Sequence, residues 1–279
     1  MLVFAYDGSL NGDWVAHYAV RFAASTPDRC LRMLHVHDAA PANHLAERVA
    51  RIADECRLLG VGFSAELHPG ASAGVAERLI ALCPPGPGTT LVCGARARAR
   101  GLAFLAGTVS ARLLASARFG VVALRVVHPG VLGQPGRVLL PVAGHPRGAA
   151  DAIPLLRLIG ADLRHLHVLF VREASRLRLH DPGHVALERL LAEGRAYVAR
   201  VEDEARAALA PHGFALDASV VLAKDVVGEI LVCAARHRVR LVCLGASERT
   251  LPERIVSGSP IERVLRETTA DVAVYRGAR

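Results

Sequence analysis

The stretch from Gly94 to Leu114, GARARARGLAFLAGTVSARLL, joins an arginine-rich segment to a run of helix-forming residues. The apolar run TTLVCGA at 89–95 leads into it and predicts a short buried strand. Gly107 and Thr108 stand where the helix is expected to start, and a glycine beside a Thr cap lets an anion approach the backbone N–H groups. The alternation of Arg and Ala favours an extended loop, since a helix would spread these charges around its surface. The stretch therefore predicts a strand, a loop suited to a phosphate, and a helix.

Much of the chain resembles another part of itself. Gly245 and Gly258 are separated by the same number of residues as Gly94 and Gly107, and Ser259 follows as Thr108 does. The other similar segments are LVFAYDGS (2–9) with VLLPVAGH (138–145), CLRMLHVHD (30–38) with DLRHLHVLF (162–170), TTLVCGA (89–95) with RLVCLGA (240–246), and FGVVALRV (119–126) with TADVAVYR (269–276). Self-similarity along the whole chain indicates a tandem repeat.

The repeat predicts two domains, 1–128 and 137–279. The segment HPGVLGQPG at 128–136 joins them, and its Pro and Gly content is typical of a linker. The offset between similar segments grows after the second strand, so the second copy is expected to carry an insertion near 174–190.

Each half alternates short apolar runs with segments of helical periodicity. Val15, Tyr18, Ala19 and Phe22, for example, fall on one face of a helix. The apolar runs lack polar alternation, which is typical of parallel strands covered on both faces. The pattern predicts an α/β fold of two tandem doubly wound domains, each a five-stranded parallel sheet with helices on both faces.

Composition narrows the function classes. A hydrophobic fraction of 52% supports a full core, whereas an aromatic fraction of 4% argues against a base-stacking surface. The net charge of +8 suits an anionic partner, but the arginines are scattered, so nucleic acid is not the expected one. We find no apolar run long enough for a membrane helix and no signal peptide in MLVFAYDGS, so a cytoplasmic location is expected.

Several motifs of known chemistry are missing from the sequence. It contains no P-loop GK[ST], no GxSxG and no HExxH, and its six cysteines form no CxxC pair. We therefore predict no metal site and no catalytic residue, and we expect buried, reduced thiols.

The glycine pattern resembles the universal stress protein family in tandem form, and the resemblance covers nearly the whole chain twice. ATP-binding members of that family carry G-x2-G-x9-G-[ST], an Asp after the first strand, and a Val near the end of the second strand that borders adenine. The resemblance implies a nucleotide site in the first half at Asp7, Val36, Gly94, Gly107 and Thr108, with Arg96 adding positive charge. In the second half it implies Val168, Gly245, Gly258 and Ser259.

The chain departs from the family pattern at three positions. Ala97 replaces the middle glycine in the first half, Glu248 replaces it in the second, and Ala143 stands where the second half would carry the Asp. A carboxylate at 248 would repel phosphates, so the first half is the better candidate for a nucleotide. The resemblance implies a stress or regulatory protein that binds ATP or a related adenine nucleotide, with or without Mg²⁺, and hydrolyses it slowly or not at all.

Other interpretations stay open at this point. Asp7 and Ser259 are also good helix or turn caps, and His35 and His167 are typical of hydrogen-bonded strand residues. The protein could instead act through its surfaces without a nucleotide, or hydrolyse a phosphoryl substrate. The last strands of the two halves, near 121–126 and 272–275, could pair with each other within one chain. Alternatively, two copies of the chain could form a homodimer through sheet edges or domain faces.

Overall fold

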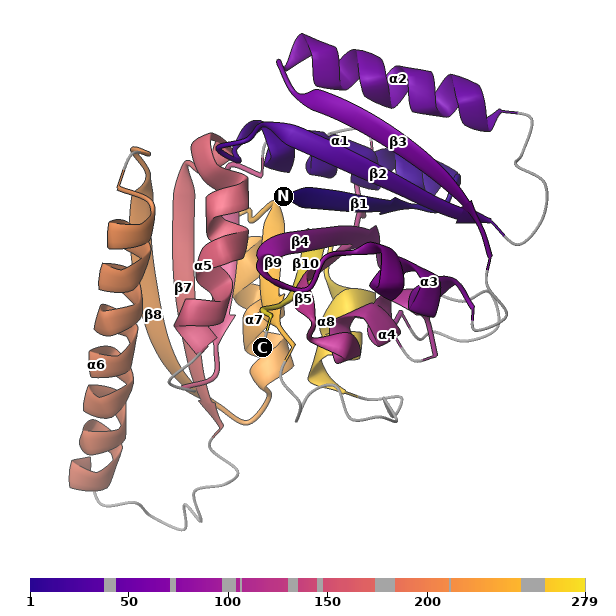
Figure 1. Cartoon of the computed structure of the whole chain (residues 1–279). Coiled ribbons are helices and arrows are strands. Elements are labelled where there is room, and N and C mark those ends of the chain that lie inside the picture. The colour runs from indigo at the N-terminus through magenta and orange to yellow at the C-terminus, as the bar shows by residue number, and fades with distance from the viewer. Residues whose placement is uncertain are drawn as a thin grey trace.

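A computed structural model gives the structure of the chain (Figure 1). The described residues are 1–37, 44–70, 74–96, 104–105, 107–129, 135–144, 148–173, 184–210, 212–246 and 259–278.

Strands and helices alternate in each half. The first half contains β1 (Leu2–Tyr6), α1 (Leu10–Ala24), β2 (Cys30–His37), α2 (Leu45–Leu58), β3 (Gly62–Pro69), α3 (Val75–Leu82), β4 (Gly86–Gly94), α4 (Val109–Ser116) and β5 (Phe119–Arg125). The second half contains β6 (Arg137–Val142), α5 (Gly148–Ile159), the 3-10 turn η2 (Gly160–Asp162), β7 (His165–Glu173), α6 (His184–Ala208), β8 (Ala215–Ala223), α7 (Val226–Arg236), β9 (Leu241–Gly245), α8 (Pro260–Glu267) and β10 (Asp271–Arg276).

The strand order confirms the repeat and the α/β fold class. The sheet runs β3-β2-β1-β4-β5 in the first half and β8-β7-β6-β9-β10 in the second, so the two halves have the same topology. All neighbours within a half are parallel. In each half the order changes direction beside the first strand, which is where ligands bind in open α/β sheets.

The two halves share one sheet. β5 and β10 pair antiparallel, with Arg125 opposite Val272 and Val121 opposite Arg276, so ten strands are continuous (Figure 1). This confirms the predicted pairing within one chain. A buried hydrogen bond of 2.5 Å from the Tyr18 hydroxyl to Asp271 also links the halves. The pairing leaves β3 and β8 at the outer edges of the sheet.

Helices cover the sheet on both faces. One apolar cluster joins the sheet to α1, α2, α5 and α6, and the other joins it to α3, α4, α7 and α8. The core consists mainly of Val, Leu, Ile and Ala, as a chain with few aromatics requires. The strands near the middle of the sheet are thereby buried on both faces, which explains their continuous apolar sequences, whereas the edge strands β3 and β8 keep exposed positions.

The halves differ most between the second strand and the third. Helix α6 has 25 residues, whereas its counterpart α2 has 14. Residues 174–183 lie outside the described part, so the insertion expected near 174–190 stays a prediction. Among the described residues, no helix is both long and apolar enough to cross a membrane.

Candidate functional site

A pocket of about 310 Å³ opens at the carboxyl ends of the first-half strands. Its walls come from the ends of β1, β2 and β4, from the first turns of α1 and α4, and from α3. This is the switch in strand order between β1 and β4, where the chain leaves one side of the sheet for the other. Sheet topology therefore places a cavity where the fold class predicts a ligand.

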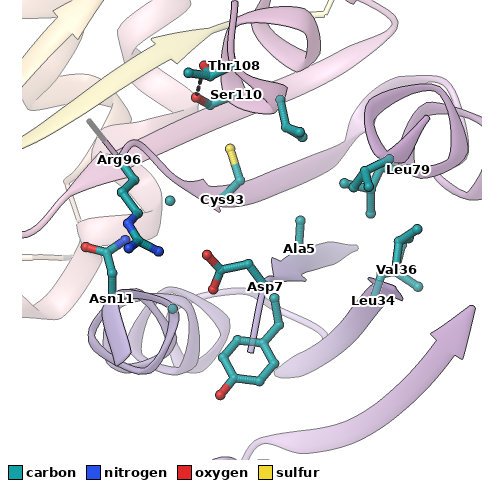
Figure 2. A pocket seen from close by; sticks show the side chains of 15 residues that line it. Ala5, Asp7, Asn11, Leu34, Val36, Leu79, Cys93, Arg96, Thr108 and Ser110 are labelled. Carbon is teal, nitrogen blue, oxygen red and sulfur yellow. Dashed lines mark hydrogen bonds between the residues drawn. The ribbon is translucent and has the colours of Figure 1, made fainter. Parts of the chain in front are cut away.

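Most of the predicted first-half residues meet at this pocket. Asp7, Val36, Gly94, Arg96 and Thr108 all line it (Figure 2). The remaining one, Gly107, directly precedes Thr108, is exposed, and has a φ of +67°, a conformation that favours glycine. The structure thus brings together residues that are up to about a hundred positions apart in the chain.

Asp7 has both a turn role and a place in the pocket. Its Oδ1 accepts hydrogen bonds from the Ser9 N–H at 3.0 Å and the Ser9 hydroxyl at 2.7 Å, and Ser9 caps α1 through Gly12. The turn interpretation is therefore confirmed. Figure 2 also shows the carboxylate pointing into the pocket from the end of β1. Gly12 permits this geometry, because a Cβ there would lie 2.9 Å from the Tyr6 ring and closer still to the Asp7 carboxylate.

One wall of the pocket is apolar. Val36 and Leu34 on β2 and Leu79 on α3 form this side of the pocket (Figure 2). Val75 on α3 also lines the pocket. Val36 keeps 9% of its surface exposed, whereas Leu34 is fully buried. An apolar wall of branched side chains suits a flat aromatic ring such as a purine.

The opposite wall suits an anion. Thr108 caps α4, because its hydroxyl accepts from the Ala111 N–H at 3.3 Å while donating to the Leu105 carbonyl at 2.8 Å. The first N–H groups of a helix lack partners within the helix and attract negative charge. Arg96 also lines the pocket and adds a positive charge to it (Figure 2).

A buried carboxylate from the second half holds the segment that leads to this helix. The Glu262 side chain, 2% exposed, accepts hydrogen bonds from the Phe104 N–H at 2.8 Å and the Leu105 N–H at 2.7 Å. Leu105 in turn accepts from the N–H and the hydroxyl of Thr108. The side of the first-half pocket that suits an anion is therefore linked to α8 by hydrogen bonds. Sequence reasoning missed this role, since Glu262 sits in a capping-box pattern that explains it locally.

Three further side chains at or beside the pocket are buried, and two of them are held by hydrogen bonds. His35, a buried strand residue, pairs its Nδ1 with the Tyr6 carbonyl at 2.8 Å, which confirms the structural interpretation of this histidine. The Tyr6 hydroxyl donates to Asp13, and burial together with this carboxylate raises the pKa of Tyr6. Burial, reinforced by the charge of Asp7, raises the pKa of the Cys93 thiol to about 12. The thiol is therefore protonated at neutral pH and is a poor nucleophile.

The universal stress protein family model matches residues 136–276, which is half of the chain. The chain belongs to the universal stress protein family. No curated protein matches it.

Solved structures extend the fold likeness over the first half of this universal stress protein. A universal stress protein from Archaeoglobus fulgidus is 16% identical, with 98% of this chain and 97% of that chain covered and a TM-score of 0.61. A putative universal stress protein from Pseudomonas aeruginosa is 18% identical, with 98% and 92% covered and a TM-score of 0.58. The cytoplasmic domain of a prokaryotic cation chloride cotransporter is 10% identical, with 99% and 95% covered and a TM-score of 0.59. At these identities the likeness shows a shared fold.

The second-half site is only partly described. Gly258 and Glu248 lie outside the described residues. Gly245 is exposed at the end of β9, and Ser259 caps α8 by accepting from the Glu262 N–H at 3.2 Å, as its capping-box sequence predicts. Ala143 is exposed after β6 and precedes Gly144, whose φ of +76° matches the +73° of Gly8 in the first half.

Val168 does not belong to this edge, and its prediction as a site residue is wrong. It is fully buried and pairs with Leu140 in the middle of the strand. Tyr6 pairs with His35, and the equivalent Val142 pairs with Phe170, so Val171 occupies the register position of Val36. The similar sequences of segments 30–38 and 162–170 suggest an alignment of His35 with His167. Strand pairing shifts this alignment by three residues, and the sequence alone carries no signal of that shift.

Proposed function

We propose that the protein binds ATP or a related adenine nucleotide in the first-half pocket and acts as a nucleotide-responsive regulatory protein. The supporting observation is the pocket itself, which places an apolar wall opposite a capped helix start and an arginine at the switch in strand order. Its volume of about 310 Å³ is at the lower end of the range for small-molecule sites.

In this proposal each wall of the pocket binds a different part of the nucleotide. The adenine ring packs against Val36 and Leu79, and Asp7 accepts a hydrogen bond from the ribose. The phosphates lie at Gly107 and Thr108, with Arg96 offsetting their charge. Gly94 leaves room beside the pocket, because a Cβ there would lie 3.0 Å from the Asn11 amide nitrogen. ATP is the proposed ligand with or without Mg²⁺, and a cytoplasmic location and slow or absent hydrolysis are part of the proposal.

A second candidate function is a nucleotide-independent interaction protein. It is favoured by the structural roles of two signature residues, because the Asp7 carboxylate and the Thr108 hydroxyl both stabilise helix starts. Those roles would keep the residues in place without any ligand. The fold is also found in a transporter's cytoplasmic domain, so it does not by itself imply a nucleotide.

A variant that fills the pocket and a matched control in the second half distinguish between the two candidate functions. Val36→Phe adds a ring on the apolar wall, and Val171→Phe makes the same change at the matching register position of the second half. We expect wild type and Val171→Phe to bind ATP with Mg²⁺ in calorimetry and to melt at a higher temperature with it, because a ligand of the native state stabilises that state. Val36→Phe should lose both effects.

Two results would count against nucleotide binding. If wild type shows neither a heat of binding nor a thermal shift at about millimolar ATP, the result favours the interaction protein, because even weak ligands bind at that concentration. Equal ATP affinity in wild type and Val36→Phe would place the nucleotide elsewhere.

A further inference from the structure

Three metal-ligating side chains meet in the second half, away from the pocket. His167 is the third residue of β7, so it lies toward the amino end of the parallel strands, opposite the edge where their carboxyl ends lie. Cys233 lies on α7 and His237 caps its C-terminus. Residues four apart on a helix share a face, and α7 packs against β7, so both reach the same side of the strand.

The three side chains are close enough to share one ion. Their candidate ligand atoms, one nitrogen from each imidazole and the Cys233 sulfur, all lie within 4.8 Å of one another. The two imidazole rings are 4.0 Å apart between centroids. A tetrahedral zinc ion with bonds of about 2.0 Å to nitrogen and 2.3 Å to sulfur requires ligand separations of roughly 3.3–3.6 Å. Rotamer shifts of about 1 Å would close the site.

His167 carries an unexplained nitrogen. Its side chain is 4% exposed, and its Nε2 pairs with the Ser219 hydroxyl on β8 at 2.9 Å. Its Nδ1 is buried and has no hydrogen-bond partner among the described residues. Buried polar atoms are almost always paired, so an unpaired one indicates a missing partner. If Nε2 donates to Ser219, Nδ1 holds the lone pair that a metal needs, and a hydrogen bond on the second nitrogen is typical of metal-bound histidine.

We propose that His167, Cys233 and His237 form a three-ligand site for a borderline-soft transition-metal ion, with Zn²⁺ as the ion that two imidazoles and one thiolate suit best. Binding replaces the proton of the Cys233 thiol by the metal and changes no oxidation state. Cys233 is 8% exposed and His237 is partly exposed, so the fourth coordination position faces the more open side and is available to water or an external ligand. The ion would join α7 to the edge of the sheet formed by β7 and β8.

Sequence spacing could not reveal this site. Cys233 and His237 are only one Cys-x3-His pair, and the third ligand, His167, is on a strand more than sixty residues earlier in the chain. Only the packing of α7 on β7 brings the third ligand to the other two.

The test is metal titration of the reduced, metal-free full chain. Zn²⁺ is added in competition with a chromophoric chelator, and Co²⁺ is added separately as a spectroscopic probe. We expect one Zn²⁺ per chain at submicromolar affinity, and a thiolate-to-cobalt charge-transfer band with the intense visible absorption of four-coordinate Co²⁺. Cys233→Ser should remove that band and weaken Zn²⁺ binding about 100-fold or more, while His237→Gln should weaken it about 10- to 100-fold.

Matched controls come from exposed residues of the same types. Cys30→Ser and His44→Gln should keep the wild-type affinity and spectrum, since Cys30 is exposed and the His44 side chain is 76% exposed. His237→Gln changes a partly exposed helix cap, so it keeps the test decisive if Cys233→Ser fails to fold. Wild-type Zn²⁺ affinity in both Cys233→Ser and His237→Gln, or a Co²⁺ complex without a thiolate band, would overturn the proposal. The nucleotide proposal does not depend on this test, because the metal site and the first-half pocket share no residue. Val36→Phe should accordingly bind Zn²⁺ as wild type does.

Discussion

Glu262→Gln tests whether the second half supports the first-half pocket that we propose to bind a nucleotide. The carboxylate accepts two backbone N–H groups, from Phe104 and Leu105, at 2.8 and 2.7 Å in a buried position. An amide of the same shape has only one oxygen, so one of the two N–H groups would face an NH2 group instead. The substitution therefore keeps the volume of the side chain and removes one hydrogen bond and the charge.

The expected cost follows from these contacts. A hydrogen bond to a charged group contributes about 1.5–3 kcal/mol, and a buried N–H without a partner costs about 1–3 kcal/mol. These two effects describe the same lost contact, so we expect Glu262→Gln to destabilise the segment at 104–105 by about 2 kcal/mol. With an unfolding entropy of about 2.1 cal/mol/K per residue, this lowers the melting temperature of a chain of 279 residues by roughly 3–4 °C. Because Leu105 holds Thr108, about 1.4 kcal/mol of this cost should appear in ATP affinity, which is a tenfold higher Kd.

Calorimetry and thermal melting with and without ATP measure both effects. Glu267→Gln is the matched control, since Glu267 lies on the same helix, is 39% exposed and pairs with Arg263 at the surface. The control should stay within about 0.5 kcal/mol of wild type. If Glu262→Gln bound ATP with wild-type affinity while its melting temperature fell as expected, the proposed link between α8 and the pocket would be wrong.

Two further predictions concern charge. Arg96→Ala should raise the Kd for ATP about five- to tenfold and reduce its dependence on salt, because Arg96 is an exposed charge that we propose to lie near the phosphates. Arg112→Ala on α4, whose guanidinium pairs with Glu77 outside the pocket, should change neither in the same titration. His17 pairs with Glu55 at 2.8 Å, and the hydrogen bond to this carboxylate raises the pKa of His17 above 6.5. The pair therefore stabilises the fold fully below pH 6.5 and loses this effect as pH rises through the folded-state pKa, so His17→Gln should lower the melting temperature at about pH 5.5 and leave it unchanged at about pH 9. The effect is below about 1 kcal/mol because the pair is partly exposed, and a deficit that grew with pH would contradict the assignment.

Much of the candidate site could be predicted from local pattern. Asp7, Gly94 and Thr108 end strands or start helices, and the carboxyl ends of parallel strands must lie at one edge of a sheet. Their meeting in one pocket follows from the order of elements, which apolar periodicity reveals. Val168 shows where this reasoning fails. Its position at the sheet edge or in the middle depends on which residue of β6 it pairs with, and sequence similarity between the two halves does not reveal that pairing.

The sequence by itself determined the tandem repeat, the alternation of strands and helices, and the edge at which the first-half residues gather, since each depends on periodicity and spacing along the chain. Only the tertiary structure decided the register of β7, the hydrogen bonds from Glu262 to the first half, and the meeting of His167 with Cys233 and His237. These features join residues far apart in the chain through side-chain packing. Packing depends on the shapes and positions of both partners at once, and neither partner's local sequence contains that information.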